Sequence, residues 1–325
     1  MSVFIASCAQ ISIQKPLSDE WFYMPVHYDE PFVRAIDPDY KPFINPIAGR
    51  RMGLIMKRAI ATSMTALADA SLVQPDAIVT ATGLGCIENT EKFLKTLCYE
   101  GESCLQPTYF INSTHNTIGS SIALHKKSHG YNNTHVHKGI SFESALLDAM
   151  LQFELGKIEN ALVGAYDEMT QDYYHLLDKI NMWDGTFASE TAVATVLKKN
   201  GDIELVDLDI LYKPEKQLLI DRTNLLCNKK GISTENIDLL VTGKNNNKEN
   251  NAVYEAFEKS IGLENKSETY KNIFGESFTS SAYGFYYAFE CLRKGRSPQG
   301  KDANNILIYN HYKNIDHSLI LLSRC

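Results

Sequence analysis

Two stretches of this 325-residue chain repeat one pattern, and this repeat constrains the fold more than any other feature. Residues 139–154 read GISFESALLDAMLQFE, and residues 275–290 read GESFTSSAYGFYYAFE. Both contain G-x-S-F-x-S, then eight residues, then F-E, and the copies lie 136 residues apart. A repeated unit at this spacing predicts a duplicated architecture, with the chemistry located where the two copies meet.

Composition narrows the class of protein. A hydrophobic content of 44% and a charged content of 22% are typical of a soluble globular chain. The net charge of −7 argues against a nucleic-acid surface, which needs clustered Lys and Arg. The sequence contains no run of 18 apolar residues, so no membrane span is predicted. The opening MSVFIASCAQISIQ has no basic segment before its apolar run, so it is interpreted as a first strand and not a signal peptide.

Cysteine usage points to a compartment. The seven cysteines are scattered and form no CxxC motif, which predicts reduced thiols and a cytoplasmic location. Cys8, Cys86 and Cys291 lie in apolar patterns and are expected to be buried.

Strand and helix patterns alternate along the chain, which predicts an α/β protein with mostly parallel sheets covered by helices. Helices are expected at about 47–70, 116–128, 141–157, 214–231, 248–261 and 275–295, and a further helix is expected to begin near residue 88. Strands are expected at about 2–13, 77–85, 107–112, 132–139, 160–168, 189–198, 203–212, 237–243, 304–312 and 317–325. The aromatic residues at 283–289 are expected to be helix core, with the border of an acyl tunnel as the alternative.

The order of several segments resembles the β-ketoacyl synthases of the thiolase superfamily. The segments that carry the likeness are RRMGLIMKRAIATSMTALADASL, ATGLG, PTYFINSTHNTIGSSIAL, HGYNNTHVHKG, GKIENALVGAYDE and ASETAVATVLKKN. They span nearly the whole chain, and the likeness rests on their order and spacing. It implies a thiolase-like fold, in which two βαβαβαββ halves form a five-layer αβαβα sandwich. Residues 1–200 would form the N-terminal half and residues 201–325 the C-terminal half.

The catalytic positions of the family hold other residues here. Condensing members use a Cys at a helix N-terminus and two His residues in the second half. Counting from residues 156–168 places the Cys position at Gly139, or one residue away at Lys138 or Ile140. Lys244 stands at the first His position and Glu276 at the second. The C-terminal Gly-Phe-Gly-Gly loop reads NHYKN at 310–314.

Because the Cys, both His residues and the Gly-Phe-Gly-Gly loop are all replaced, no residue is assigned a catalytic role. The replacements together predict an inactive member of the family. Lys244 and Glu276 are expected to form a buried ion pair in place of the two histidines.

The resemblance then implies a chain-length-factor type subunit. Such a subunit pairs with an active ketosynthase of fatty acid or polyketide biosynthesis, including polyene biosynthesis, and limits the length of the acyl chain. Residues 107–116 and 132–139 would form the dimer interface, and self-pairing is the alternative assembly. An acyl-carrier protein is a further expected partner, with its 4′-phosphopantetheine as the substrate arm, and no other cofactor is expected.

An active 3-oxoacyl-[acyl-carrier-protein] synthase or acyltransferase with a rearranged site stays open, so enzymatic activity is undecided. Its nucleophile would be Ser141 or a nearby Cys. The sequence around Ser141 also approaches the G-x-S-x-G pattern of serine hydrolases, although a helix-capping role explains Ser141 and Ser277 better. His135 and His137 alternate on one strand and could chelate a metal, but roles at a subunit interface are favoured, and no metal is expected.

Overall fold

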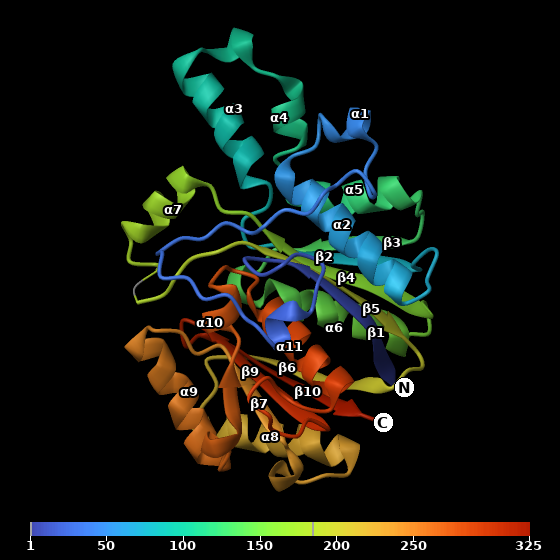
Figure 1. Ribbon diagram of the computed structural model, residues 1–325, viewed down its shortest axis with the longest axis vertical. Coiled ribbons are helices and arrows are strands. Elements are labelled where there is room, and N and C mark those ends of the chain that lie inside the picture. The colour runs from blue at the N-terminus through green and yellow to red at the C-terminus, as the bar shows by residue number, and fades with distance from the viewer. Residues whose placement is uncertain (1, 184) are drawn as a thin grey trace.

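The computed structural model describes residues 2–183 and 185–325 (Figure 1). Ten strands in these residues form a sheet of order β3-β2-β4-β5-β1-β6-β10-β9-β7-β8. Their bounds are β1 Val3–Ile11, β2 Ala77–Ala81, β3 Tyr131–His135, β4 Asn160–Asp167, β5 Thr191–Lys198, β6 Ile203–Tyr212, β7 Leu239–Thr242, β8 Ser267–Thr269, β9 Asn305–Tyr312 and β10 Asp316–Arg324.

The strand order confirms the predicted duplication. The first five strands run β3-β2-β4-β5-β1, and the last five run β8-β7-β9-β10-β6, which is the same order with every number raised by five. Strand directions repeat as well: β2 is parallel to β3 and β4, and β7 is parallel to β8 and β9. The two halves meet through a short antiparallel pairing of Val3 and Phe4 in β1 with β6.

Helices fill three layers around the two half-sheets, which confirms the five-layer sandwich (Figure 1). Helices α2 (Leu54–Asp69) and α5 (Thr117–Lys126) cover the outer face of the first half. Helices α8 (Lys216–Lys230) and α9 (Lys248–Ile261) cover the outer face of the second half. Helices α6 (Ser141–Glu154) and α11 (Ser281–Lys294) lie between the half-sheets.

The central layer holds the main hydrophobic core. Its aromatic side chains on α11 are buried as predicted: Tyr283, Phe285, Tyr286, Tyr287 and Phe289. The ring of Phe285 lies edge-on to that of Phe142, with centroids 5.4 Å apart, and this contact joins α11 to α6. Aromatic side chains bury large apolar areas, so this layer contributes heavily to stability.

Shorter helices complete the chain. They are α1 (Pro46–Gly49), α3 (Ile87–Tyr99), α4 (Pro107–Ile111), α7 (Gln171–Asp178) and α10 (Lys271–Phe274), and the sequence patterns did not predict α7, α10 or β8. Helices α3 and α4 project together from the body near α1 (Figure 1). No helix in the described residues is both long enough and apolar enough to cross a membrane.

Three predicted elements in the first half differ from the structure. Residues 107–112 are not a strand: Pro107 occupies the first turn of helix α4, where its missing N–H is no loss. The predicted helix at 47–70 is broken into α1 and α2, with Gly53 as the N-cap of α2. The strand predicted at 132–139 is β3, which ends at His135.

The repeated motif does not mark equivalent positions, although the two halves are equivalent. Helix α6 begins two residues after Gly139, whereas α11 begins six residues after Gly275. The predicted helix at 275–295 therefore starts late. Gly275 has φ of +81°, the backbone of Glu276 pairs with residues 187 and 189, and residues 278–280 form a turn before α11 begins.

Candidate functional site

The positions singled out by the sequence surround one cavity of about 170 Å³. Its lining includes Gly139 before α6, Glu276 before α11, and residues 310–313 at the end of β9. Gly243 and Asn245 line it after β7, but Lys244 between them does not. No cysteine is among the described residues that line the cavity. The fold thus brings these segments together around one cavity.

Gly139 is packed directly against the ring of Tyr312. A Cβ atom built on Gly139 would lie 2.3 Å from Cδ2 and 2.5 Å from Cγ of Tyr312. Real Cβ atoms do not come within 3.0 Å of such atoms, so no side chain fits at residue 139 while the ring stays in place. Tyr312 belongs to the segment that resembles the Gly-Phe-Gly-Gly loop. The ring of Tyr312 thus fills the space that a side chain at residue 139 would need.

Lys138 and Ser141 flank this position. Lys138 is exposed, opens the 3₁₀ turn Lys138–Ile140 and has φ of +47°, an uncommon conformation for a residue other than glycine. Ser141 is fully buried, and its hydroxyl accepts the backbone N–H of His137 at 2.7 Å. The same hydroxyl lies 2.8 Å from the carbonyl oxygen of Lys138 and 3.0 Å from that of Thr82. Ser141 thus fixes the turn into α6, and no hydrogen bond in the described residues links it to an imidazole or a carboxylate.

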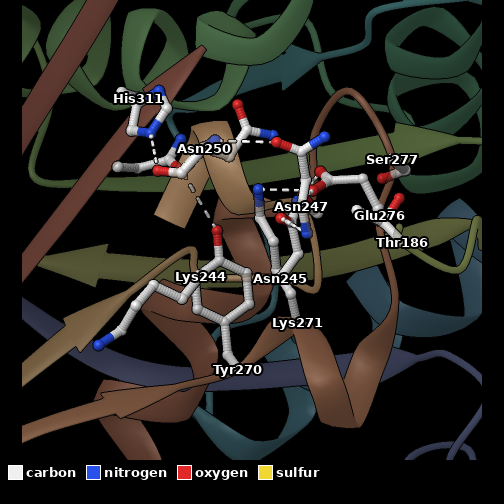
Figure 2. Close-up of polar contacts among 12 residues, drawn as sticks. Thr186, Lys244, Asn245, Asn247, Asn250, Tyr270, Lys271, Glu276, Ser277 and His311 are labelled. Atoms are coloured by element: carbon white, nitrogen blue, oxygen red, sulfur yellow. Dashed lines mark hydrogen bonds and ion pairs between the residues drawn. The ribbon is translucent and has the colours of Figure 1, made fainter. Parts of the chain in front are cut away.

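Glu276 is held by three side chains on the cavity wall, of which Lys271 and Asn245 are labelled in Figure 2. Its Oε2 accepts from Nζ of Lys271 at 2.7 Å and from Nδ2 of Asn245 at 3.0 Å. Its Oε1 accepts from the hydroxyl of Ser280 at 2.9 Å. The side chain of Lys271 is only 8% exposed and that of Glu276 is 18% exposed, so the ion pair is largely desolvated.

The predicted pairing of Lys244 with Glu276 is wrong. Nζ of Lys244 lies 2.6 Å from Oε1 of Glu258 on α9. The cavity is lined by Gly243 and Asn245, the residues on either side of Lys244. The side chain of Lys244 itself extends towards the outer helix layer. Sequence reasoning missed Lys271, which α10 and the turn at Gly275 bring beside Glu276. A lysine five residues before Glu276 was the available signal.

Histidine and tyrosine groups in the cavity wall do not form an acid–base pair. Burial lowers the pKa of His311 to about 3. Its Nε2 donates to the carbonyl of Asn250 at 3.1 Å (Figure 2). Its Nδ1 accepts the backbone N–H of Asn314 at 3.1 Å, so the ring is neutral and both of its nitrogens are hydrogen-bonded. Burial also raises the pKa of Tyr254 and raises that of Tyr312 to about 12. These three groups keep one protonation state near neutral pH.

A buried carboxyl, Glu143, joins the elements beneath the cavity. It accepts from the hydroxyls of Ser281 on α11 at 3.1 Å and Ser318 on β10 at 3.0 Å, and Nδ2 of Asn310 on β9 lies 3.5 Å away. Burial raises the pKa of Glu143. The sequence patterns did not single out this residue.

The remaining sequence candidates lie elsewhere. Cys8, Cys86 and Cys291 are buried as expected, and burial raises the pKa of each thiol. His135 contacts Asp148 and His137 contacts Ser144, and no cluster of three or more His, Cys, Asp or Glu side chains in the described residues is arranged to hold a metal.

Comparison with known proteins places this geometry in context. The family model for the β-ketoacyl synthase N-terminal domain matches residues 26–241. No curated protein matches in sequence. Among solved structures, the ishigamide ketosynthase/chain length factor has a TM-score of 0.82 at 14% identity, covering 100% of this chain and 99% of that chain.

Two further structures show the same likeness. A ketosynthase in complex with its chain length factor from Xenorhabdus doucetiae has a TM-score of 0.83 at 11% identity, covering 100% of this chain and 98% of that chain. A β-ketoacyl synthase from Burkholderia phymatum STM815 has a TM-score of 0.79 at 14% identity, covering 100% and 99%. At these identities the likeness establishes the fold over the full length of both chains.

Proposed function

Because this chain belongs to the β-ketoacyl synthase family, we propose that it is a non-condensing subunit of the chain-length-factor type. The observation that carries this proposal is the ring of Tyr312 against Gly139. Condensation by this family begins with acyl transfer to a thiolate, and residue 139 has neither a thiol nor space for one.

The second-half positions support the same proposal. Developing negative charge at a condensing site is stabilised by hydrogen-bond donors aimed into the site. Here Glu276 places a carboxylate on the cavity wall, and its three donors are already used to hold it. Both ring nitrogens of His311 are hydrogen-bonded to backbone groups. This arrangement stabilises the wall and leaves these groups without a catalytic role.

The proposed partner is an active, cysteine-bearing ketosynthase. Two of the similar solved structures pair ketosynthases with chain length factors, which favours such a partner for this chain. In the described part of the chain, the edge strand β3 has β2 on one side and no strand on the other, so this edge offers a place for a partner strand, although the N–H of Thr134 already donates to Oδ1 of Asn133. An open groove of about 730 Å³ runs between α5 and β3.

Exposed apolar side chains border this edge and form what we term the β3 face. They are Leu124 on α5, Val136 after β3, and Leu151 and Leu155 on α6. Apolar side chains gathered beside an open strand mark an interaction surface. The interface predicted at 107–116 and 132–139 includes β3 in its second segment and stays part of the proposal.

In this assembly the acyl chain would be bound to the partner's thiol. The pathway is proposed to be polyketide biosynthesis, including polyenes, or fatty acid biosynthesis. The 4′-phosphopantetheine arm of an acyl-carrier protein would deliver substrate to the active subunit, and this chain would bound the acyl tunnel and limit product length.

Co-purification tests the proposal. The tagged chain is co-expressed with each cysteine-bearing ketosynthase of its own genome, and the complex is supplied with carrier protein and extender units. We expect one ketosynthase to co-purify at equal stoichiometry and to make products of defined length only when this chain is present. Leu151→Lys on the β3 face should abolish pairing, whereas Leu218→Lys on α8, a similarly exposed position, should not.

Two results would overturn the proposal: no ketosynthase co-purifies, or the ketosynthase makes the same products without this chain.

A further inference from the structure

Three side chains of the edge strand β3 form contacts with one carboxylate, that of Asp148. Tyr131, Asn133 and His135 alternate along β3, and all three contact Asp148 on α6. The hydroxyl of Tyr131 lies 3.0 Å from Oδ2 of Asp148, and so do Nδ2 of Asn133 and Nε2 of His135. Nε2 of Gln152 donates to Oδ1 at 3.1 Å. The side chain of Asp148 is only 12% exposed.

The charge on this carboxylate is solvated mainly by neutral groups. Burial opposes ionisation of Asp148, but hydrogen bonds from His135, Asn133, Gln152 and Tyr131 outweigh burial and lower its pKa. In the described residues, its one ion-pair contact is with His135, and no Lys or Arg pairs with it. Asp148 therefore places a negative charge beneath the open edge of the sheet.

Symmetry decides what this charge would meet in a self-paired dimer. Two copies of an edge strand that pair antiparallel are related by a two-fold axis, which passes beside the middle residue when the strands pair over their full length. The middle residue of β3 is Asn133. Asp148 contacts Asn133 and also Tyr131 and His135, which lie two positions before and after it. Paired strands lie about 4.8 Å apart, so both copies of Asp148 would flank the axis and face one another. Like charges placed opposite each other suppress a pairing.

We propose that Asp148 makes the β3 face reject a second copy of this chain and select a ketosynthase that presents a lysine or arginine at the matching position. This inference rests on the proposed function, and it makes Asp148 a specificity-determining residue of the heterodimer. Specificity arises from both terms: repulsion against the wrong partner and attraction to the right one.

Sedimentation equilibrium of the full chain, alone and with its ketosynthase, tests this. Asp148→Asn should strengthen self-association about tenfold or more and weaken ketosynthase binding by a similar factor. Asp148→Glu, which keeps the charge, should move neither constant by more than about twofold. Asp221→Asn on α8 changes the net charge equally at an exposed site far from β3 and serves as the matched control.

A salt titration of the unsubstituted chain and of the Asp148→Asn chain is a second test. Raising the salt concentration screens like-charge repulsion, so self-association of the natural chain should strengthen with salt, while the Asp148→Asn chain should show little change. A natural chain that self-associates as tightly as Asp148→Asn, or that weakens with salt, would overturn the inference.

The two proposals can fail separately. Ketosynthase binding that is unaffected by Asp148→Asn, with no gain in self-association, refutes the role of Asp148 and leaves the chain-length-factor function standing. Stronger self-association of Asp148→Asn without binding to a ketosynthase refutes the proposed function and retains the rejection of self.

Discussion

A single methyl group at Gly139 tests whether Tyr312 has taken the space of a catalytic side chain. In Gly139→Ala the new Cβ would lie 2.3 Å from Cδ2 of Tyr312, 2.5 Å from Cγ and 2.8 Å from Cβ. Ordinary contacts begin near 3.4 Å, so the ring has to move by about 1 Å. The backbone at Gly139 is not left-handed, so the ring is the source of the strain. Overpacking of this kind costs about 1–3 kcal/mol in the free energy of unfolding.

Urea unfolding followed by circular dichroism measures this cost. Gly49→Ala is the matched control, because its Cβ would meet Ile44 at an ordinary 3.4 Å at the end of α1. We expect no loss of stability in that control. In a Tyr312→Ala background, the penalty of Gly139→Ala should fall but not vanish, because the ring is gone while Cβ of residue 312 stays 2.8 Å from the new methyl group. An equal penalty for Gly139→Ala with and without the Tyr312 ring would refute the steric argument.

Three further predictions concern buried charge and protonation. Lys271→Met and Glu276→Gln should each lower the free energy of unfolding by about 3 kcal/mol, and a double-mutant cycle should show strong coupling between them. The effects of Lys244→Met and Glu276→Gln should instead be additive within about 0.5 kcal/mol, because Lys244 pairs with Glu258. Coupling of Glu276 to Lys244 would contradict the observed pairing. Burial raises the pKa of Glu168 to about 7, so its contribution to stability is full below its unfolded value near 4.5 and is lost as pH rises through 7. Glu168→Gln should therefore gain up to about 3 kcal/mol over the natural chain at pH 8 and nothing at pH 4, and an equal gain at both pH values would contradict this. The ring resonances of His311 should not titrate between pH 5 and pH 8 in NMR spectra, and a midpoint near 6.5 would show that the ring is not buried as described.

The duplicated topology was predictable because it depends on patterns that survive divergence. Apolar patterns and glycine turns located nine of the ten strands in the described residues, and the repeat of their order in the two halves agrees with the predicted duplication. The exceptions are local. Residues 107–112 have the aromatic and β-branched composition of a strand, but Pro107 favours a helical first turn. The three-residue strand β8 is too short to show a period.

The site was predictable in position but not in its contacts. Gly139, Glu276 and residues 310–313 line one cavity, as their places in the motif order suggested. The partner of Glu276 was not predictable from opposite charge alone, because Lys244 and Lys271 are equivalent on that criterion. Backbone direction after β7 and the turn at Gly275 decide in favour of Lys271. The contact of Tyr312 with Gly139 joins residues 173 positions apart and could be found only in three dimensions.

Intact-protein mass spectrometry tests the central claim most directly. The complex of this chain with its ketosynthase is incubated with acyl-loaded carrier protein, and the mass of each subunit is measured. The account predicts an acyl adduct on the ketosynthase and an unchanged mass for this chain. An acyl adduct on this chain, lost on Ser141→Ala or on substitution of one of its cysteines, would contradict the account and establish a rearranged active site.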